Sequence, residues 1–189
     1  MQQLEPYHRW RDQYTSEEDV RSPLFGREIN ERDYNVVYNY VLHPYWDNFG
    51  SHTLFLKILY ADYRRHCCII EMIGEWNDAI ENDISILWKE ILEPILEQGI
   101  SKFILLAENV LNFHSSDTDY YQQWYEEVSD RDGWIVCLNM PESSQYDFRK
   151  LKLNYYVELM EMPDWRKYRP EMVYKIINDK VKARLKSLE

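Results

Sequence analysis

Apolar residues change their spacing several times along the middle third of this chain, and each spacing is typical of one kind of element. From residue 54 to residue 140 the pattern reads strand, strand, helix, strand, helix, strand. Residues 53–61 and 67–76 are nearly continuous apolar runs, separated by the charged residues 62–65. Two such runs joined by a short polar turn predict a β-hairpin.

The clearest helix follows this hairpin. Between residues 78 and 98, apolar side chains recur four, three and one positions apart, which places them on one side of a helix. These side chains are Ile80, Ile84, Leu87, Trp88, Ile91, Leu92, Ile95 and Leu96. Asn77 or Asp78 would cap the start of this helix and Gly99 its end, and Pro94 would distort its last turn.

Shorter patterns complete the series. Alternating apolar residues predict a half-buried strand at 34–42, before the hairpin. After the long helix we expect strands at 102–107, 134–140 and 154–162, and helices at 119–128, at 143–150 and from Pro170 onward. The predicted fold class is α/β: a mixed sheet with an N-terminal antiparallel hairpin, parallel strands joined by helices, and a C-terminal helix.

The first thirty residues lack this periodicity. Pro23 and Gly26 interrupt them, and we expect at most one short helix, near residues 17–20. We therefore divide the chain into an arm, residues 1–30, and a single α/β domain, residues 31–189. The aromatic residues of the arm are Tyr7, Trp10, Tyr14 and Phe25. They indicate that the arm packs on its own domain or on a second copy of the chain.

Composition narrows the classes of partner. The 189 residues include 45% hydrophobic and 15% aromatic residues, which favours a folded domain over disorder. With 33 acidic and 22 basic side chains, the net charge of −11 repels nucleic acids and anionic membrane surfaces. We expect no nucleic-acid partner. Because no apolar run reaches about 18 residues and the first ten residues are polar, we expect no membrane span and a cytoplasmic location.

The cysteines do not suggest a disulfide framework. Cys67 and Cys68 are adjacent in a predicted strand, so their side chains point to opposite faces of the sheet. This geometry favours reduced core thiols. The alternative, a metal site with His66, would require both thiols to face one ion.

A histidine and several carboxylates lie where a strand of the parallel sheet is predicted to end. They are Glu108, His114, Asp117 and Asp119. Ligands collect at this edge of α/β sheets, and these side chains can bind a divalent metal or transfer protons. Residues 139–144 follow the neighbouring strand and share the edge. The alternative is that acidic residues here only stabilise the start of a helix.

Several patterns together resemble a known family. Residues 72–76, Met-Ile-Gly-Glu-Trp, precede the amphipathic helix, and residues 112–116, Asn-Phe-His-Ser-Ser, precede the next helix. In this order of elements the chain resembles the STAS domain, the family of anti-anti-sigma factors and of the cytosolic tails of sulfate transporters. The resemblance implies a domain that binds partner proteins without catalysis. It also implies a phosphorylation switch at Ser115 or Ser116, although the same serines could simply cap a helix.

Two other groups of residues are candidates for binding. Tyr120, Tyr121, Trp124 and Tyr125 crowd one predicted helix, so some must be exposed, and exposed aromatic rings mark protein contacts. His43, Tyr45, Trp46, Asp47 and His52 could line a small-molecule pocket, but a loop covering the sheet edge explains them as well.

Motifs of nucleotide chemistry are absent. The chain has five glycines and no GxSxG, Walker-type or GxGxxG pattern, so we expect no cofactor other than a divalent metal at the strand-end cluster. The sequence therefore predicts a non-catalytic, cytosolic protein-interaction or regulatory domain, acting with a protein partner or as a homo-oligomer. The alternative is a small metal-dependent or acid/base enzyme, or a ligand-binding protein, that uses residues Glu108 to Asp119.

Overall fold

The computed structural model describes residues 2–116 and 118–187. Its strands are β1 (Gln2–Leu4), β2 (Asn35–Val37), β3 (Tyr40–Leu42), β4 (Leu54–Asp62), β5 (Cys67–Asn77), β6 (Lys102–His114), β7 (Trp134–Leu138) and β8 (Glu158–Met160). Its α-helices are α1 (Asp83–Leu87), α2 (Glu93–Glu97), α3 (Asp119–Ser129), α4 (Glu142–Lys150) and α5 (Pro170–Lys186). A π-helical turn, η1 (Trp88–Leu92), joins α1 to α2, and η2 (Leu153–Tyr155) and η3 (Trp165–Lys167) are 3₁₀ turns.

The main sheet has five strands in the order β4-β5-β6-β7-β8. β4 is antiparallel to β5, and each following pair is parallel. This arrangement confirms the predicted α/β class, the initial hairpin and the parallel strands joined by helices. A second, smaller sheet has the order β1-β3-β2, with β2 at one edge. In the part of the chain that the structure describes, no helix is long and apolar enough to cross a bilayer.

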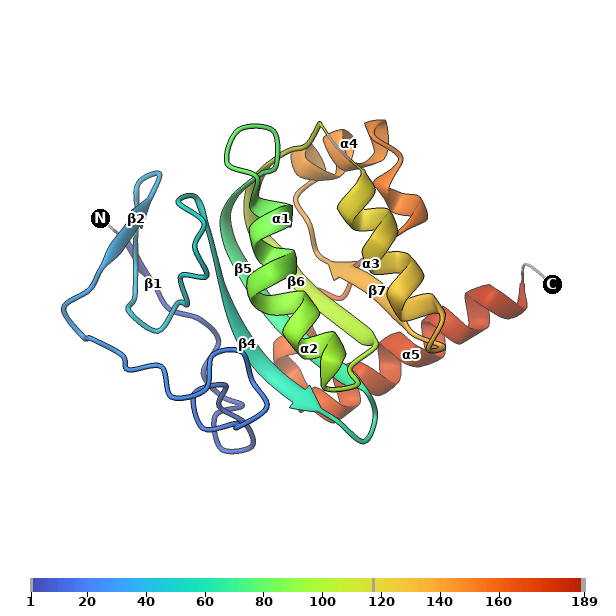
Figure 1. Cartoon of the computed structure of the whole chain (residues 1–189), viewed down its shortest axis with the longest axis horizontal. Coiled ribbons are helices and arrows are strands. Elements are labelled where there is room, and N and C mark those ends of the chain that lie inside the picture. The colour runs from blue at the N-terminus through green and yellow to red at the C-terminus, as the bar shows by residue number, and fades with distance from the viewer. Residues whose placement is uncertain (1, 117, 188–189) are drawn as a thin grey trace.

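The main sheet is covered on both faces (Figure 1). One face carries α1, η1, α2, α3 and α4, and among the described residues its core contains eight buried aromatic side chains. They are Phe49, Trp76, Trp88, Phe103, Phe113, Tyr121, Trp124 and Phe148. The other face is covered by α5 and the N-terminal arm, whose core contains Trp10 and Trp165. The small sheet packs beside them through Val37 and Leu42, against Phe55 and Ile73 of the main sheet.

The strand predicted at 102–107 is longer than its apolar run. β6 continues to His114, paired with β5 on one side, whereas its pairing with β7 ends at Leu106. Beyond that point α4 packs on β6, and the Ser144 hydroxyl donates a 2.9 Å hydrogen bond to the carbonyl of Val110. The segment Glu108 to His114 is therefore strand, although the sequence placed it after the strand's end.

The long helix begins later than predicted. Helical residues run continuously from Asp83 to Glu97, and Ile80, expected on the buried stripe, is 81% exposed. Pro94 explains the π-turn in the middle: its ring would collide with the carbonyl four residues earlier, and a wider turn avoids this. The Glu93 amide accordingly donates to the carbonyl of Trp88, five residues back. Gly99, at φ +87°, follows the helix end as predicted.

Two predicted strands were wrong in extent. Residues 34–42 form the hairpin β2–β3 instead of one strand, because Tyr38 adopts a left-handed conformation with φ 53° and reverses the chain. In the region 154–162 only Glu158–Met160 is strand, since Leu153–Tyr155 forms a 3₁₀ turn. Strand β1 pairs in parallel with β3 and was not predicted from the sequence.

The arm of residues 1–30 packs on its own chain. Trp10 is 2% exposed and its indole nitrogen donates to the carbonyl of Tyr168 at 3.0 Å. Farther along the arm, Glu17 forms an ion pair with Lys57 of β4. Phe25, in contrast, is 56% exposed. The arm therefore contributes to the hydrophobic core of the described fold.

Candidate functional site

The ends of β5 and β6 meet the starts of α1 and α3 at one buried carboxylate, Asp78. Its Oδ1 accepts hydrogen bonds from the Trp76 indole at 2.9 Å and from the Ile84 amide at 2.8 Å. Its Oδ2 accepts one from the Tyr121 hydroxyl at 2.6 Å, and the Ser115 side chain also bonds to the carboxylate. Asp78 thus links four elements at the rim where ligands of α/β sheets usually bind.

Burial dominates the electrostatics of this carboxylate. It raises the pKa of Asp78 from 3.8 to about 6, although the hydrogen bonds from Tyr121, Ile84, Ser115 and Trp76 act in the opposite direction. The Asp78 carboxylate is therefore a buried acid, and the hydrogen bonds that it accepts, including that from Tyr121, stabilise its charged form. From the sequence, Asp78 was only a candidate helix cap. Trp76 and Tyr121 are the sequence signal that could have revealed Asp78, because a buried indole N–H or tyrosine hydroxyl requires a hydrogen-bond partner.

Glu108, the first residue of the predicted metal cluster, lies apart from the rim. It is on the face of the sheet that α5 covers, where its Oε1 accepts a 2.7 Å hydrogen bond from the Trp165 indole. Its Oε2 accepts a hydrogen bond from Arg166 at 2.9 Å. Because Glu108 and His114 are six residues apart on one strand, about 20 Å separates them along the chain. They cannot share one metal ion in this conformation.

The remaining members of that cluster are also dispersed. His114 is half exposed, with its Nε2 3.9 Å from Oε1 of Glu75. Asp119 is the first residue of α3, and Asp117 lies outside the described residues. Within residues 2–116 and 118–187, no group of three or more histidine, cysteine or carboxylate side chains could hold a metal ion.

The serine pair falls at the predicted strand end but the two side chains differ. Ser115 is half buried and bonds to Asp78, whereas Ser116 is exposed. Thr118, not either serine, is the residue at the N-cap of α3, and it forms no side-chain capping hydrogen bond. The serine pair thus lies two and three residues before the N-cap of α3.

The aromatic helix α3 is largely a core element. Tyr121 and Trp124 are fully buried, so these two residues do not form a protein-contact surface in this conformation. Tyr120 is half buried and its hydroxyl hydrogen-bonds with Ser85 at 3.0 Å. Tyr125 remains exposed, at 41%, and its ring lies 5.9 Å from that of Tyr156. Of the four predicted contact residues, Tyr125 has the largest accessible ring.

The loop around His43 to His52 covers the edge of the main sheet, as the second of its two interpretations predicted. Asp47 and Leu56 exchange backbone hydrogen bonds of 2.7 and 3.1 Å, so the loop pairs with β4. Trp46 is buried beneath it. Cys67 and Cys68 are also buried, as free thiols, and burial raises the pKa of both.

An exposed apolar surface that the sequence did not reveal lies on the hairpin β2–β3. Tyr34, Val36 and Tyr38, in β2 and directly beside it, are 50%, 59% and 48% exposed. Val36 points outward from β2, whereas the Tyr38 hydroxyl reaches back to Asn112 and Glu75 of the main sheet. Val37, between them, is buried against the main sheet. We call the surface formed by Tyr34, Val36 and Tyr38 the hairpin surface.

Comparison with known proteins yields a distant likeness in fold. No protein-family model and no curated protein matches the chain. Two solved structures are similar to it: the anti-sigma factor antagonist SpoIIAA in its unphosphorylated form, and the Bacillus cell fate determinant SpoIIAA in its phosphorylated form. Each is 15% identical, with TM-scores of 0.49 and 0.45. The matches cover 65% and 64% of this chain and 96% and 98% of the other.

The STAS resemblance noted in the sequence thus has only a weak counterpart in these two SpoIIAA structures. A likeness of this degree identifies no partner for this chain. Its function has to be argued from its own residues.

Proposed function

We propose that this chain is a non-catalytic, cytoplasmic protein-interaction domain of regulatory function, and that the hairpin surface contacts the partner. The observation that carries the proposal is the exposure of three large side chains, Tyr34, Val36 and Tyr38, along an edge strand and its two ends. Isolated exposed apolar residues are common, but a group of them on one surface is typical of a protein contact.

The position of β2 strengthens this proposal. β2 is hydrogen-bonded to β3 on one side and forms the edge of its sheet on the other. Such an edge presents backbone groups that can pair with a strand of another chain, and natural proteins usually protect it with charged residues. The outward residue of β2 is instead Val36. Addition of a strand from a partner protein, or from a second copy of this chain, would cover both the edge and the hairpin surface.

The cysteines agree with the cytoplasmic part of the proposal. The three thiols Cys67, Cys68 and Cys137 are free and buried. Free thiols persist in reducing compartments.

A matched pair of variants tests the interaction. Val36→Lys places a charge on the hairpin surface, and Val20→Lys places the same charge on the arm, where Val20 is 73% exposed. Tagged wild-type and variant proteins are used to capture partners from an extract of their own cells, and light scattering measures self-association at several concentrations. We expect Val36→Lys to lose the partner or the oligomer and Val20→Lys to retain it. Equal binding by both variants would refute the hairpin surface as the contact.

The regulatory part of the proposal concerns the serine pair. A phosphate on Ser115 would lie beside the Asp78 carboxylate, which accepts a hydrogen bond from the Ser115 side chain. The added negative charge would repel Asp78 and loosen the start of α3. Ser115→Glu should therefore lower the unfolding midpoint in urea more than Ser116→Glu, because Ser116 is exposed. Equal midpoints would remove Ser115 as the site of this effect.

A further inference from the structure

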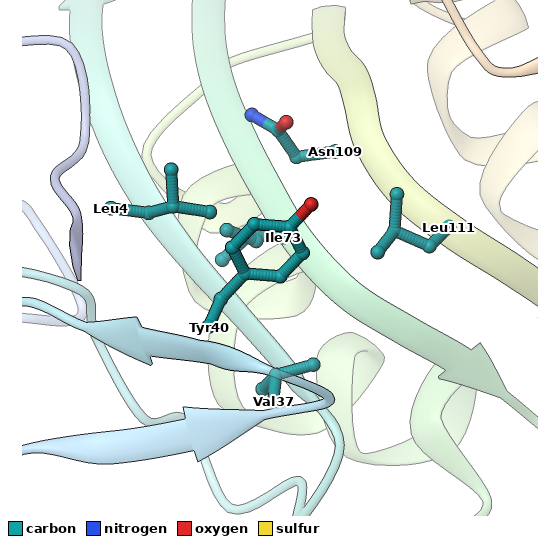
Figure 2. Close-up of a pocket in the computed structure, with 6 residues that line it drawn as sticks. All are labelled: Leu4, Val37, Tyr40, Ile73, Asn109 and Leu111. Atoms are coloured by element: carbon teal, nitrogen blue, oxygen red, sulfur yellow. The ribbon is translucent and has the colours of Figure 1, made fainter. Parts of the chain in front are cut away.

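A cavity of about 230 Å³ separates the small sheet from the main sheet. It is lined by Leu4, Val37, Tyr40, Ile73, Asn109 and Leu111. Figure 2 shows the Tyr40 ring reaching from the hairpin across β5, with Asn109 and Leu111 on β6 beyond it. Both sheets therefore contribute to the wall.

Irregular pairing between β5 and β6 shapes the β6 wall of this cavity. The register shifts between the pairs Glu71–Leu106 and Ile73–Asn109. It shifts again between the pairs Gly74–Val110 and Glu75–Asn112. At each shift β6 supplies one residue more than β5. These bulges allow Val110 and Phe113 to remain in the core under the helices while Asn109 and Leu111 face the cavity.

The polar groups of the wall are available to a ligand. Among the described residues, neither the Asn109 amide nor the Tyr40 hydroxyl has a side-chain hydrogen-bond partner. The amide can donate and accept, and so can the hydroxyl. The neighbouring amide of Asn112 differs, because it donates to the Tyr38 hydroxyl at 3.0 Å. Two polar groups with unused capacity thus face an otherwise aliphatic cavity.

Size and charge restrict the ligand. Drug-sized ligands occupy pockets of roughly 300–1,000 Å³, whereas a cavity of about 150 Å³ holds benzene. A volume of about 230 Å³ lies between these and suits a molecule of one or two fused rings. No charged side chain lines the cavity within the described residues, and an unpaired charge would be costly to bury. The lining favours a neutral molecule.

We propose that the cavity between the two sheets binds a small, neutral aromatic molecule with one hydrogen-bonding group, of the size of indole. The aliphatic side chains and the Tyr40 ring contact its ring faces, and the Asn109 amide or the Tyr40 hydroxyl bonds to its polar group. This ligand site goes beyond the proposed protein contact and does not depend on it.

Indole itself is the first probe, measured by calorimetry and by saturation-transfer NMR on the full chain. 1-Methylindole lacks the donor and should bind about fivefold more weakly, the loss expected for one neutral hydrogen bond. Indole-3-carboxylate should bind more weakly still, because the cavity offers no cation. If the wild-type protein binds none of the three compounds, the proposal is wrong.

Variants locate the binding. Leu111, which is half exposed, lines the cavity, so Leu111→Trp should fill it and weaken indole binding by at least about tenfold. Asn109→Leu and Tyr40→Phe each remove one polar group and keep the branching of the side chain, and at least one of them should weaken indole binding about fivefold. Asn154→Leu is the matched control, on the exposed turn η2 beside the helical face of the sheet, and should leave indole binding unchanged.

Every variant is first checked by urea unfolding, and only variants that fold as the wild type does are compared. If the Leu111→Trp protein does not fold, Tyr40→Phe still tests whether indole binds in this cavity. Unchanged indole affinity in both Asn109→Leu and Tyr40→Phe, or equal losses in Asn154→Leu, would place the binding elsewhere and overturn the assignment.

Discussion

The hydroxyl of Tyr121 donates a 2.6 Å hydrogen bond to the buried carboxylate of Asp78, and this contact joins α3 to the end of β5. Tyr121→Phe removes one donor from a buried, charged acceptor, so the free energy of unfolding should fall by about 1.5–3 kcal/mol. The pKa of Asp78, already about 6, should rise further, since that hydrogen bond lowers it. Urea unfolding at neutral pH measures the loss.

Tyr120→Phe is the control for this prediction. The Tyr120 hydroxyl is half buried and bonds to the neutral Ser85 hydroxyl at 3.0 Å, so its loss should cost about 1 kcal/mol or less. Equal costs for the two tyrosines would show that the Asp78 carboxylate has no special role at the rim.

Glu71 should make the stability depend on pH. Burial raises its pKa from 4.5 to about 7, despite a 2.7 Å hydrogen bond from the Tyr7 amide and the nearby Arg166. The folded state therefore keeps a proton that the unfolded state releases. The stability that this proton contributes is complete below about pH 4.5 and is lost as the pH rises through about 7.

Glu71→Gln cannot titrate and should remove this dependence. Between pH 4.5 and pH 8 the variant should gain on the order of 3 kcal/mol in unfolding free energy relative to the wild type. Glu97 is exposed, so Glu97→Gln serves as the control: its unfolding free energy should differ from that of the wild type by the same amount at every pH. A constant difference for Glu71→Gln as well would contradict the raised pKa.

The interior and the class of the fold could be predicted from the sequence because apolar spacing determines them. The boundaries could not, for local reasons. The carboxylates of Asp78 and Asp83 moved the helix start, since Asp78 accepts a hydrogen bond from the Ile84 amide and Asp83 one from the Asn77 amide. Pro94 introduced the π-turn in the middle of the helix. β6 extends past its apolar run because pairing with β5 supports polar residues such as Asn109 and Asn112.

The predicted sites were less accurate because they assumed that residues near in sequence lie together. Glu108 and His114 lie in one extended strand and are therefore far apart. The aromatic residues of α3 alternate between core and surface, which composition alone does not reveal. The hairpin surface depends on the turn at Tyr38, and no residue pattern in the sequence specified that turn.

Gly74, within β5, has no room for a side chain. Its φ is +119°, and a Cβ atom built on it would lie 2.1 Å from the carbonyl oxygen of Thr53. Gly74→Ala should therefore cost at least about 3 kcal/mol in thermal or urea unfolding. Gly26→Ala, at φ +72° with nothing within 4 Å, should cost only about 1 kcal/mol. The idea fails if the two substitutions are equally tolerated.

The N-terminal arm should behave as part of the core. Trp10 packs edge-on against Tyr7 and Trp165, at 5.2 and 5.4 Å between ring centroids. Trp10→Ala should lower the free energy of unfolding by about 3–5 kcal/mol. Phe25→Ala, on an exposed ring of the same arm, should change it by about 0.5 kcal/mol or less. A stable Trp10→Ala protein would mean that the arm is an appended segment.

The hairpin surface is tested most directly by amide hydrogen exchange at residues 34–38, measured with and without the captured partner or, for a homo-oligomer, at high and low protein concentration. We predict that these amides become at least about tenfold slower on association, because strand addition at β2 would bury and pair them. The amides of α3 near the exposed Tyr125 are the internal reference in the same measurement. Unchanged exchange at 34–38 together with slower exchange elsewhere would contradict the account.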